Sequence, residues 1–396
     1  MIDRRAHWRR QVLTHEFVAE SCAFADLTGD GVDDLIAGPY RWPVLDGENT
    51  GPPTRFRDVP KTWLPPWGGG DRRDPHTHLR AAGGHAPQYR AATYDWPIRT
   101  ASGRPDSLLA VGMHQDPIRV HHHHPAVGWT AREAVAAGGI YESAVYTALD
   151  SNGTHGLVTV PQRPHIAWYE PHQDPAAPWV EHLVGKRGGD WHGLGVGAVD
   201  TDERPHILTP TGIYAPGPDI RAPWQWTPLH VDNTPAPVRG LGDVGLIHTH
   251  RFDGQPATLF AASPHARGCW RFDLIDADAR RRVYRRHTLD TATSQLHALT
   301  VLPATVDEPC DAWVITGKRW QAHGPDHDID PHGTPVLMRI GVHADPADSH
   351  HVELIDDHSG VGLHFAARRL SDGRMQIATA NKLGVHLFTE NPGGPS

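Results

Sequence analysis

The sequence predicts an all-β fold, a seven-bladed β-propeller, from three observations. Stretches of about twenty residues recur along the chain, each with a strand rich in small residues, a polar Asp/Gly turn and a more hydrophobic second strand. An aromatic or His-flanked strand follows most of these copies. The 40 glycines and 36 prolines lie between short strand-like runs, which is typical of all-β proteins rather than of disordered chains.

The repeats account for the whole chain. The clearest copy is ESCAFADLTGDGVDDLIAGP at 20–39, and a seventh copy covers 361–389. Copies begin near residues 20, 89, 142, 192, 242 and 297. Because repeats of this period indicate an array or a propeller, we expect a single domain over 1–396, although the length alone would allow more than one.

A fourth strand follows each of the first six repeats. These strands are expected at 56–60, 128–135, 178–185, 225–232, 282–290 and 350–357. The seventh repeat has none after it, whereas HWRRQVLTH at 7–15 has the same signature and no repeat before it. We therefore expect the N-terminal strand to complete blade seven and remove an open sheet edge. Long Gly/Pro-rich inserts near 43–86 and 320–335 are candidate functional loops.

Composition excludes several classes of protein. No run of eighteen apolar residues is present, and the basic N-terminus has no apolar segment after it, so neither a membrane span nor a secretory signal is expected. Three scattered cysteines favour a reducing compartment, and we expect a cytoplasmic protein. The formal net charge of −9 argues against nucleic acid as a partner. The oligomeric state is not indicated.

Ionisable residues recur at one position of the aligned repeats, the start of the innermost strand. They are Glu20, Tyr89, Glu142, His192 and His297, with Asp243 or its neighbour in the fifth repeat. In the last repeat the position is Gly362, just ahead of His364. Imidazole and carboxylate groups together are ligands of zinc, manganese or iron. The sequence therefore predicts a divalent ion held by Glu142, His192 and His297 at the mouth of a central channel. The alternative is a solvated channel mouth, where charged groups cost little.

Basic residues follow the second strands of the later repeats. They are Lys318, Arg319 and His323 after the sixth, Lys382 after the seventh and His265 after the fifth. They could hold a substrate oxyanion, and Lys318 could act as an acid–base group if it is desolvated. The alternative is that they tie blades together. Trp320 lies beside them and could stack on a sugar ring.

The first repeat also contains an acidic turn. Asp26, Asp30 and Asp34 alternate with other residues around Gly31, as ligands do in the first half of a calcium loop. A tight turn capped by Asp side chains explains the pattern equally well. Either reading gives this turn a structural role.

Several of these motifs carry a resemblance to a known family. The segments ESCAFADLTGDGVDDLIAGPY, HGLGVGAVD, SQLHAL, TGKRWQAH, SGVGLHF and NKLGV resemble the FG-GAP/VCBS-repeat β-propellers, in particular the group that includes the propeller domain of aldos-2-ulose dehydratase. The resemblance implies a lyase or isomerase of the dehydratase type that acts on a keto-sugar or a related polyhydroxy carbonyl compound. The related enzyme has further domains, so steps performed by those domains are not expected here.

The resemblance suggests a role for each candidate residue. His192, His297 and Glu142 would hold the metal that polarises the carbonyl. Glu20 or His364 would take the proton α to it, and a protonated Lys or His would help a β-hydroxyl to leave. Substrate contacts are expected from Tyr89, His265, Arg319, Trp320, His323 and Lys382.

Two other functions remain open at this stage. One is a non-catalytic propeller that binds a sugar or a protein. The other is a metal-free acid–base enzyme of secondary metabolism.

Overall fold

The computed structural model describes most of the chain. The described residues are 7–15, 19–26, 32–37, 54–56, 92–99, 105–112, 118–124, 128–136, 143–162, 165–174, 177–186, 193–201, 203–232, 240–278, 280–320 and 328–391. They are built almost entirely from β-strands, which confirms the predicted all-β class. No helix in these ranges has the length and apolarity needed to cross a bilayer.

The strands of the first half of the chain are β1 (Trp8–Thr14), β2 (Cys22–Ala25), β3 (Asp34–Ala37), β4 (Thr54–Phe56), β5 (Ala92–Arg99), β6 (Pro105–Gly112), β7 (Ile118–His124), β8 (Gly128–Val135), β9 (Ala144–Ala148), β10 (His155–Gln162), β11 (His165–Glu170), β12 (Val180–Gly185), β13 (Gly195–Ala198) and β14 (Pro205–Thr209). Those of the second half are β15 (Gly212–Ala215), β16 (Gln225–Val231), β17 (Ile247–His250), β18 (Thr258–Ala262), β19 (Arg267–Ala277), β20 (Arg282–Ser294), β21 (Leu299–Pro303), β22 (Ala312–Gly317), β23 (Leu337–Val342), β24 (His351–Asp356), β25 (Phe365–Arg369), β26 (Met375–Asn381) and β27 (Gly384–Glu390).

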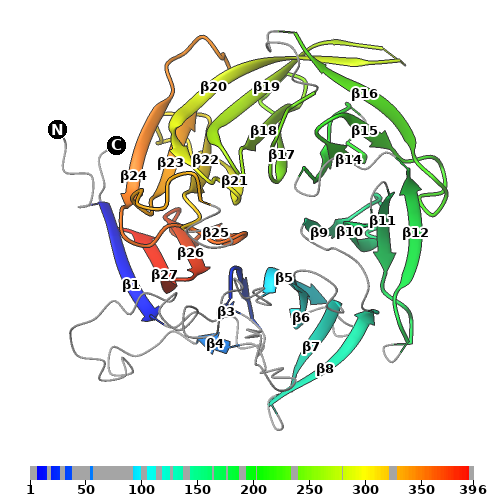
Figure 1. Cartoon of the computed structure of the whole chain (residues 1–396), viewed down its shortest axis with the longest axis horizontal. Helices are drawn as coiled ribbons and strands as arrows, with labels where there is room; N and C mark the ends of the chain where they lie inside the picture. The colour runs from blue at the N-terminus through cyan, green and yellow to red at the C-terminus, as the bar shows by residue number, and fades with distance from the viewer. Residues whose placement is uncertain are drawn as a thin grey trace.

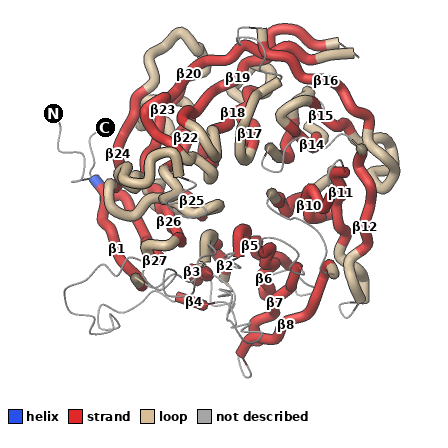
Figure 2. The backbone as a smooth tube through the Cα atoms, viewed as in Figure 1, coloured by secondary structure: helices blue, strands red, loops and turns tan. Residues whose placement is uncertain are grey.

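The described strands form six sheets arranged around a common centre (Figure 1). Consecutive strands pair antiparallel within each sheet, so each sheet runs outward from the centre as a meander. One sheet has eight strands because the outer strands β16 and β20 pair in parallel and join two meanders. The sequence did not predict this outer junction. Figure 2 shows how strands dominate the ring, with loops linking them at the centre and the rim.

The innermost strands contact one another in series. β9 contacts β13, which contacts β17, and β17 is followed by β21 and β25. β25 in turn contacts β2, which contacts β5. The outer edge of the last sheet is completed by the N-terminal strand, because β1 pairs antiparallel with β27. This pairing is the one predicted for strand 7–15.

Small residues are needed where the sheets converge. A Cβ atom at Gly195 of β13 would lie 2.0 Å from the carbonyl oxygen of Ile247 on β17. At Gly197 it would lie 2.1 Å from Oγ1 of Thr249. The hydrophobic clusters lie between consecutive sheets; the cluster of Trp313, Ile315 and Phe388, for example, joins β22 to β27. The repeating small-then-hydrophobic pattern of the sequence thus follows from inner strands that touch and outer strands that pack.

Arginines join neighbouring sheets at the turns that follow the innermost strands. Both carboxylate oxygens of Asp200 accept from Nη2 of Arg282, at 2.6 and 2.8 Å, and Nη2 of Arg251 donates to the Asp200 backbone carbonyl. Nη2 of Arg369 on β25 likewise donates to the carbonyl of Pro303 on β21, at 3.2 Å. At Asp200, the Arg282 guanidinium supplies the positive charge that a metal cation supplies in an acidic calcium-binding loop.

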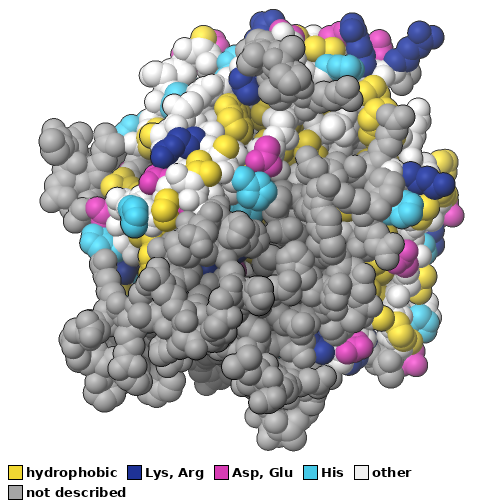
Figure 3. Space-filling view, viewed as in Figure 1, with side chains coloured by type: hydrophobic (Ala, Val, Ile, Leu, Met, Phe, Trp, Pro, Cys, Tyr) yellow, Lys and Arg dark blue, Asp and Glu magenta, His cyan; other side chains and the backbone are white. Residues whose placement is uncertain are grey.

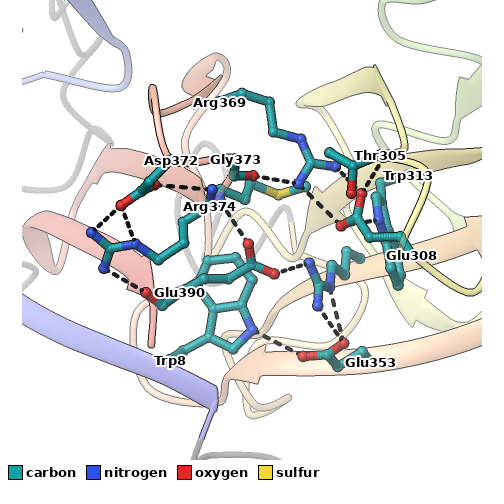
Figure 4. A network of polar contacts seen from close by, with 12 residues as sticks. Trp8, Thr305, Glu308, Trp313, Glu353, Arg369, Asp372, Gly373, Arg374 and Glu390 are labelled. Atoms are coloured by element: carbon teal, nitrogen blue, oxygen red, sulfur yellow. Dashed lines mark hydrogen bonds and ion pairs between the residues drawn. The ribbon is translucent and has the colours of Figure 1, made fainter. Parts of the chain in front are cut away.

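A second polar network holds β1 in place (Figure 4). The indole N–H of Trp8 donates to Oε1 of Glu353 on β24, at 2.9 Å, and Nε of Arg339 donates to Oε2 of the same carboxylate. The Arg339 guanidinium lies over the rings of Trp8 and Trp313 and also pairs with Glu390 at the end of β27. The N-terminal strand is therefore tied to two sheets.

We expect Trp8→Ala to destabilise the protein by about 3–5 kcal/mol, since it removes a buried aromatic ring and leaves Glu353 with one donor fewer. Urea unfolding followed by tryptophan fluorescence measures the effect. Val306→Ala, at a fully exposed position, is the control and should change stability by less than about 0.5 kcal/mol. Equal stabilities of the two variants would show that β1 is not part of the cooperative fold.

Candidate functional site

The candidate site lies where innermost strands begin and second strands end. In an antiparallel pair these two ends are neighbours: Leu299, the first residue of β21, pairs with Thr316 of β22, and Phe365 of β25 pairs with Thr379 of β26. The site segments are those that precede an inner strand or follow a second strand. They contain Glu20, Gln295, His297, Lys318, Arg319, His364 and Lys382.

Backbone hydrogen bonds fix these segments across sheet boundaries. The amides of Leu363 and His364 donate to the carbonyl of Glu20, at 2.8 and 3.2 Å. The amide of Arg319 donates to the carbonyl of Gln295, at 2.9 Å. Gly362 permits the first contact, because a Cβ atom there would lie 2.2 Å from the Glu20 carbonyl oxygen. The side chains of the site therefore project from a rigid backbone frame.

Glu20 is the acidic centre of the cluster. Its Oε2 accepts from Nε of Arg319 at 2.7 Å, and its Oε1 lies 3.3 Å from Nζ of Lys382. The Glu20, Arg319 and Lys382 side chains are each no more than 3% exposed. One carboxylate from before β2 thus joins cations that follow β22 and β26, which are distant in sequence.

Burial and charge set the protonation of this group. Burial alone would raise the pKa of Glu20, but the charges of Arg319 and Lys382 and their hydrogen bonds outweigh it and lower the pKa to about 2. Burial lowers the pKa of Lys382 to about 8, although the Glu20 carboxylate opposes the shift. Glu20 is therefore an anion at neutral pH, while Lys382 can change its charge near physiological pH.

Lys318 forms a separate buried pair. Its Nζ donates to both carboxylate oxygens of Asp328, at 2.8 and 3.0 Å, and to Oγ of Ser294 at 3.1 Å. Asp328 belongs to the predicted insert 320–335, so part of that insert contributes a buried charge to the site. Its charge also acts on Lys382, whose pKa it raises. Lys318 is thus held in place by three acceptors from two segments.

Several buried polar groups have no hydrogen-bond partner within the described part of the chain, and two of them belong to Arg319 and Gln295. The first is the end of the Arg319 guanidinium, whose Nη1 and Nη2 are both unpartnered. The second is the side-chain amide of Gln295, with both Oε1 and Nε2 unpartnered and the residue fully buried. Gln295 also has φ of 60°, a left-handed conformation that is uncommon outside glycine. Strain and unpartnered buried groups cluster at functional sites.

Sequence reasoning missed Gln295 and Asp328 as site residues. Gln295 lies within SQLHAL, one of the segments that carry the family resemblance, and this was the available signal. Its left-handed backbone and unpartnered amide are visible only in three dimensions. Asp328 lies among several Asp and His residues of a polar insert, and nothing in the sequence distinguishes it from them.

Four histidines lie at or close to the same kind of strand end. The rings of His265 and His297 meet edge to face with centroids 5.5 Å apart, and Nδ1 of His265 lies 3.3 Å from Asp243. Burial, and then the charge of His248, lower the pKa of His364 to about 3. Burial also lowers the pKa of His248 to about 4. His248 and His364 are therefore neutral at physiological pH.

Several predicted residues lie outside the described part of the chain. They are Asp30, Tyr89, Glu142, His192 and His323. The predicted metal set therefore has one described member, His297, and the predicted calcium turn has two, Asp26 and Asp34. Trp320 is half-buried and directly follows Arg319.

Among the described residues, Asp356, Asp357 and His358 form a group that could hold a metal ion. Their ligand atoms lie within 4.8 Å of one another. The group follows the outer strand β24. The site cluster, by contrast, lies at inner strand ends.

The surface differs in character from this buried cluster. Figure 3 shows acidic, basic and histidine side chains interspersed over the described part of one face. Charges at such exposed positions are solvated and cost little. Buried ionisable groups, in contrast, need partners or a function.

No family model matches the chain, and no curated protein matches it. Among solved structures, an auxiliary nutrient binding protein from Bacteroides thetaiotaomicron is 9% identical, with a TM-score of 0.45, covering 76% of this chain and 69% of its own. A mutant of AofleA from Arthrobotrys oligospora is 12% identical, with a TM-score of 0.43 and coverages of 73% and 80%. A fungal alcohol oxidase in complex with copper is 11% identical, with a TM-score of 0.38 and coverages of 71% and 54%. With TM-scores below 0.5, these three similarities assign neither a fold family nor a function.

We expect Glu20→Gln to destabilise the folded protein by about 3–5 kcal/mol at pH 7, because two buried cations lose their carboxylate. The pKa of Glu20 is about 2 in the fold against an ordinary 4.5, so its contribution is present above about pH 5 and is lost as pH falls towards 2. Chemical unfolding of wild type and variant from pH 7 to pH 3 should show the difference narrowing. Glu203→Gln, at an exposed position, is the control, and a difference independent of pH would contradict the assignment.

Proposed function

We propose that the chain is a seven-bladed β-propeller of the FG-GAP/VCBS-repeat type. Dividing the eight-stranded sheet at its parallel β16–β20 junction gives seven meanders, and β1 completes the last of them. The contacts that link the innermost strands from β9 round to β5 support this arrangement. The site then lies at one mouth of the central axis, where propellers present the ends of their inner strands.

We infer that this site is that of a lyase or isomerase of the dehydratase type, which acts on a keto-sugar or related polyhydroxy carbonyl compound. The observation that carries the inference is Lys382, a buried lysine with a pKa of about 8, beside the unpartnered N–H donors of Arg319. An amine that titrates near the working pH is suited to move protons, and fixed donors stabilise negative charge on oxygen.

The proton transfers can be assigned to one residue. As the neutral amine, Lys382 takes the proton from the carbon α to the carbonyl, and the electron pair of that C–H bond forms an enolate. N–H donors of the cluster stabilise the enolate oxygen. In a dehydration, the electron pair then forms a C=C bond as the β C–O bond breaks, and the hydroxyl recovers the proton from Lys382 and leaves as water. In an isomerisation, the hydroxyl proton on the α-carbon passes to the enolate oxygen, the former carbonyl carbon takes the proton from Lys382, and the α-carbon becomes the new carbonyl.

The environment of Glu20 does not suit the role of base that the sequence suggested. A carboxylate with a pKa of about 2 is a weak proton acceptor at neutral pH. We assign it instead to positioning Arg319 and Lys382. His364, with a pKa of about 3, is likewise a weak base, and Lys318 is held by Asp328 and Ser294.

A divalent metal remains part of the proposal. Zinc, manganese or iron held by Glu142, His192 and His297 would polarise the substrate carbonyl. The Lys382 chemistry does not require it, so a metal-free acid–base enzyme is the second candidate. The third candidate is a propeller that binds a sugar without turning it over. Glu20 neutralises one of its two cations, so the cluster can bind a ligand without taking part in a reaction.

We expect kcat/KM on a keto-sugar substrate to rise with pH through about 8, because the base Lys382 loses its proton there. Burial and the charge of Arg319 lower the pKa of Lys382, and the charges of Glu20 and Asp328 raise it. Lys382→Arg keeps the charge beside Glu20 but cannot act as a base, so kcat/KM should fall by about 10²- to 10⁴-fold. Lys186→Arg, at an exposed position, is the matched control. An unchanged pH profile in Lys382→Arg would remove Lys382 from the mechanism.

Metal analysis of the untagged, dialysed chain separates the metal-assisted and metal-free candidates. We expect about one equivalent of zinc, manganese or iron, lost in His297→Ala together with activity while the circular dichroism spectrum is kept. His350→Ala, at an exposed position, should retain both. Full activity in a metal-free preparation would favour the acid–base enzyme instead.

A further inference from the structure

Among the described residues, the buried charges of the site do not sum to zero when Lys382 is protonated. Lys318 and Asp328 neutralise each other in a bidentate pair. Glu20 faces both Arg319 and Lys382, which leaves one positive charge in excess when Lys382 is protonated. All five side chains are no more than 3% exposed. Among the described residues, this cluster therefore lacks one anion.

The geometry of Arg319 indicates where that anion belongs. Glu20 uses only Nε of the guanidinium, whereas Nη1 and Nη2 are buried and unpartnered. These two nitrogens form the end of a planar fork that matches two oxygens of a carboxylate. A purely structural tie between sheets would be stronger if Glu20 used the fork as well.

Gln295 provides a second, independent observation at the same place. Its carbonyl accepts from the Arg319 amide, so the two side chains start from neighbouring points of the backbone. Its side-chain amide is unpartnered and fully buried, and its φ is 60°. A buried amide without partners in a strained backbone is costly unless a ligand satisfies it.

We propose that the substrate of this site carries a carboxylate, bound by Nη1 and Nη2 of Arg319, with the Gln295 amide left to hold the neighbouring carbonyl or enolate oxygen. The inference rests on the proposed function and narrows its substrate class to acidic keto-sugars. A carboxylate supplies the single negative charge that the described cluster lacks while Lys382 is protonated. A phosphate monoester, which is close to a dianion at neutral pH, would reverse the imbalance rather than remove it.

Calorimetric titration with a matched pair of probes tests the proposal. D-fructuronate has a carboxylate where D-fructose has a hydroxymethyl group. Inorganic phosphate is the third probe. We expect wild-type protein to bind D-fructuronate about 10- to 100-fold more tightly than D-fructose, because charge-assisted hydrogen bonds contribute more than neutral ones. Phosphate that binds more tightly than D-fructuronate would overturn the carboxylate assignment.

Two variants keep the test independent of folding. Gln295→Glu places a negative charge beside Arg319 at almost constant volume and should weaken D-fructuronate binding by about tenfold or more, with little effect on D-fructose. Arg319→Lys keeps the charge but removes the fork, and should weaken D-fructuronate binding similarly. Gln225→Glu, at an exposed position, is the control for added charge. Wild-type affinity for D-fructuronate in Gln295→Glu would overturn the proposal.

A turnover assay on the same probes separates this inference from the proposed function. Turnover of D-fructose without preferential binding of D-fructuronate would overturn the carboxylate subsite and leave the lyase or isomerase standing. Tight binding of D-fructuronate that depends on Arg319, with no turnover of either sugar, would support the subsite and overturn the proposed function.

Discussion

The ion group of Glu20, Arg319 and Lys382 is the interaction on which both the ring and the site depend. Glu20 precedes the first inner strand, β2, and its backbone carbonyl accepts two amides from the segment before β25 in the last sheet. Its carboxylate reaches cations that follow β22 and β26. Contacts of one residue therefore join the beginning of the chain to its last two sheets, and the same contacts bring the candidate functional groups together.

Close-packed glycines and the ionisable residues of the site occupy different places on the inner strands. Strands that approach this closely leave room only for small side chains, as Gly195 and Gly197 show. Several ionisable residues lie instead just before an inner strand begins or just after a second strand ends. Glu20, Arg319 and Lys382 occupy such positions. Close packing at Gly195 and Gly197 thus excludes larger side chains there, whereas these three larger residues lie at strand ends.

The periodic part of this architecture could be predicted from the sequence. The strand expected at 128–135 coincides with β8, that at 350–357 contains β24, and that at 7–15 contains β1, which pairs with β27. These strands follow from local alternation and spacing, which the sequence displays directly. Glu20, Arg319 and Lys382 were also selected, because their positions recur in the repeat. The contacts among these three residues were not predicted. The sequence suggested that Glu20 acts as a base, whereas the structure places two buried cations against its carboxylate. Gln295 and the Lys318–Asp328 pair depend on one backbone angle and on the path of an insert, neither of which has a periodic signature.

The way Glu20 binds Arg319 specifies what else the site can accept. If the carboxylate used both terminal nitrogens, the guanidinium would be satisfied and the site would be a structural ion pair alone. Because it uses Nε, the guanidinium is held in orientation on one side while its other two nitrogens remain available. Lys382 competes for the same carboxylate, which keeps Glu20 charged and prevents it from neutralising Arg319 fully. Among the described residues, two cations that share one anion therefore give a rigid site with one positive charge in excess while Lys382 is protonated. Such a site is preorganised for a negative group, whether that charge is carried by the ligand or develops on it during reaction.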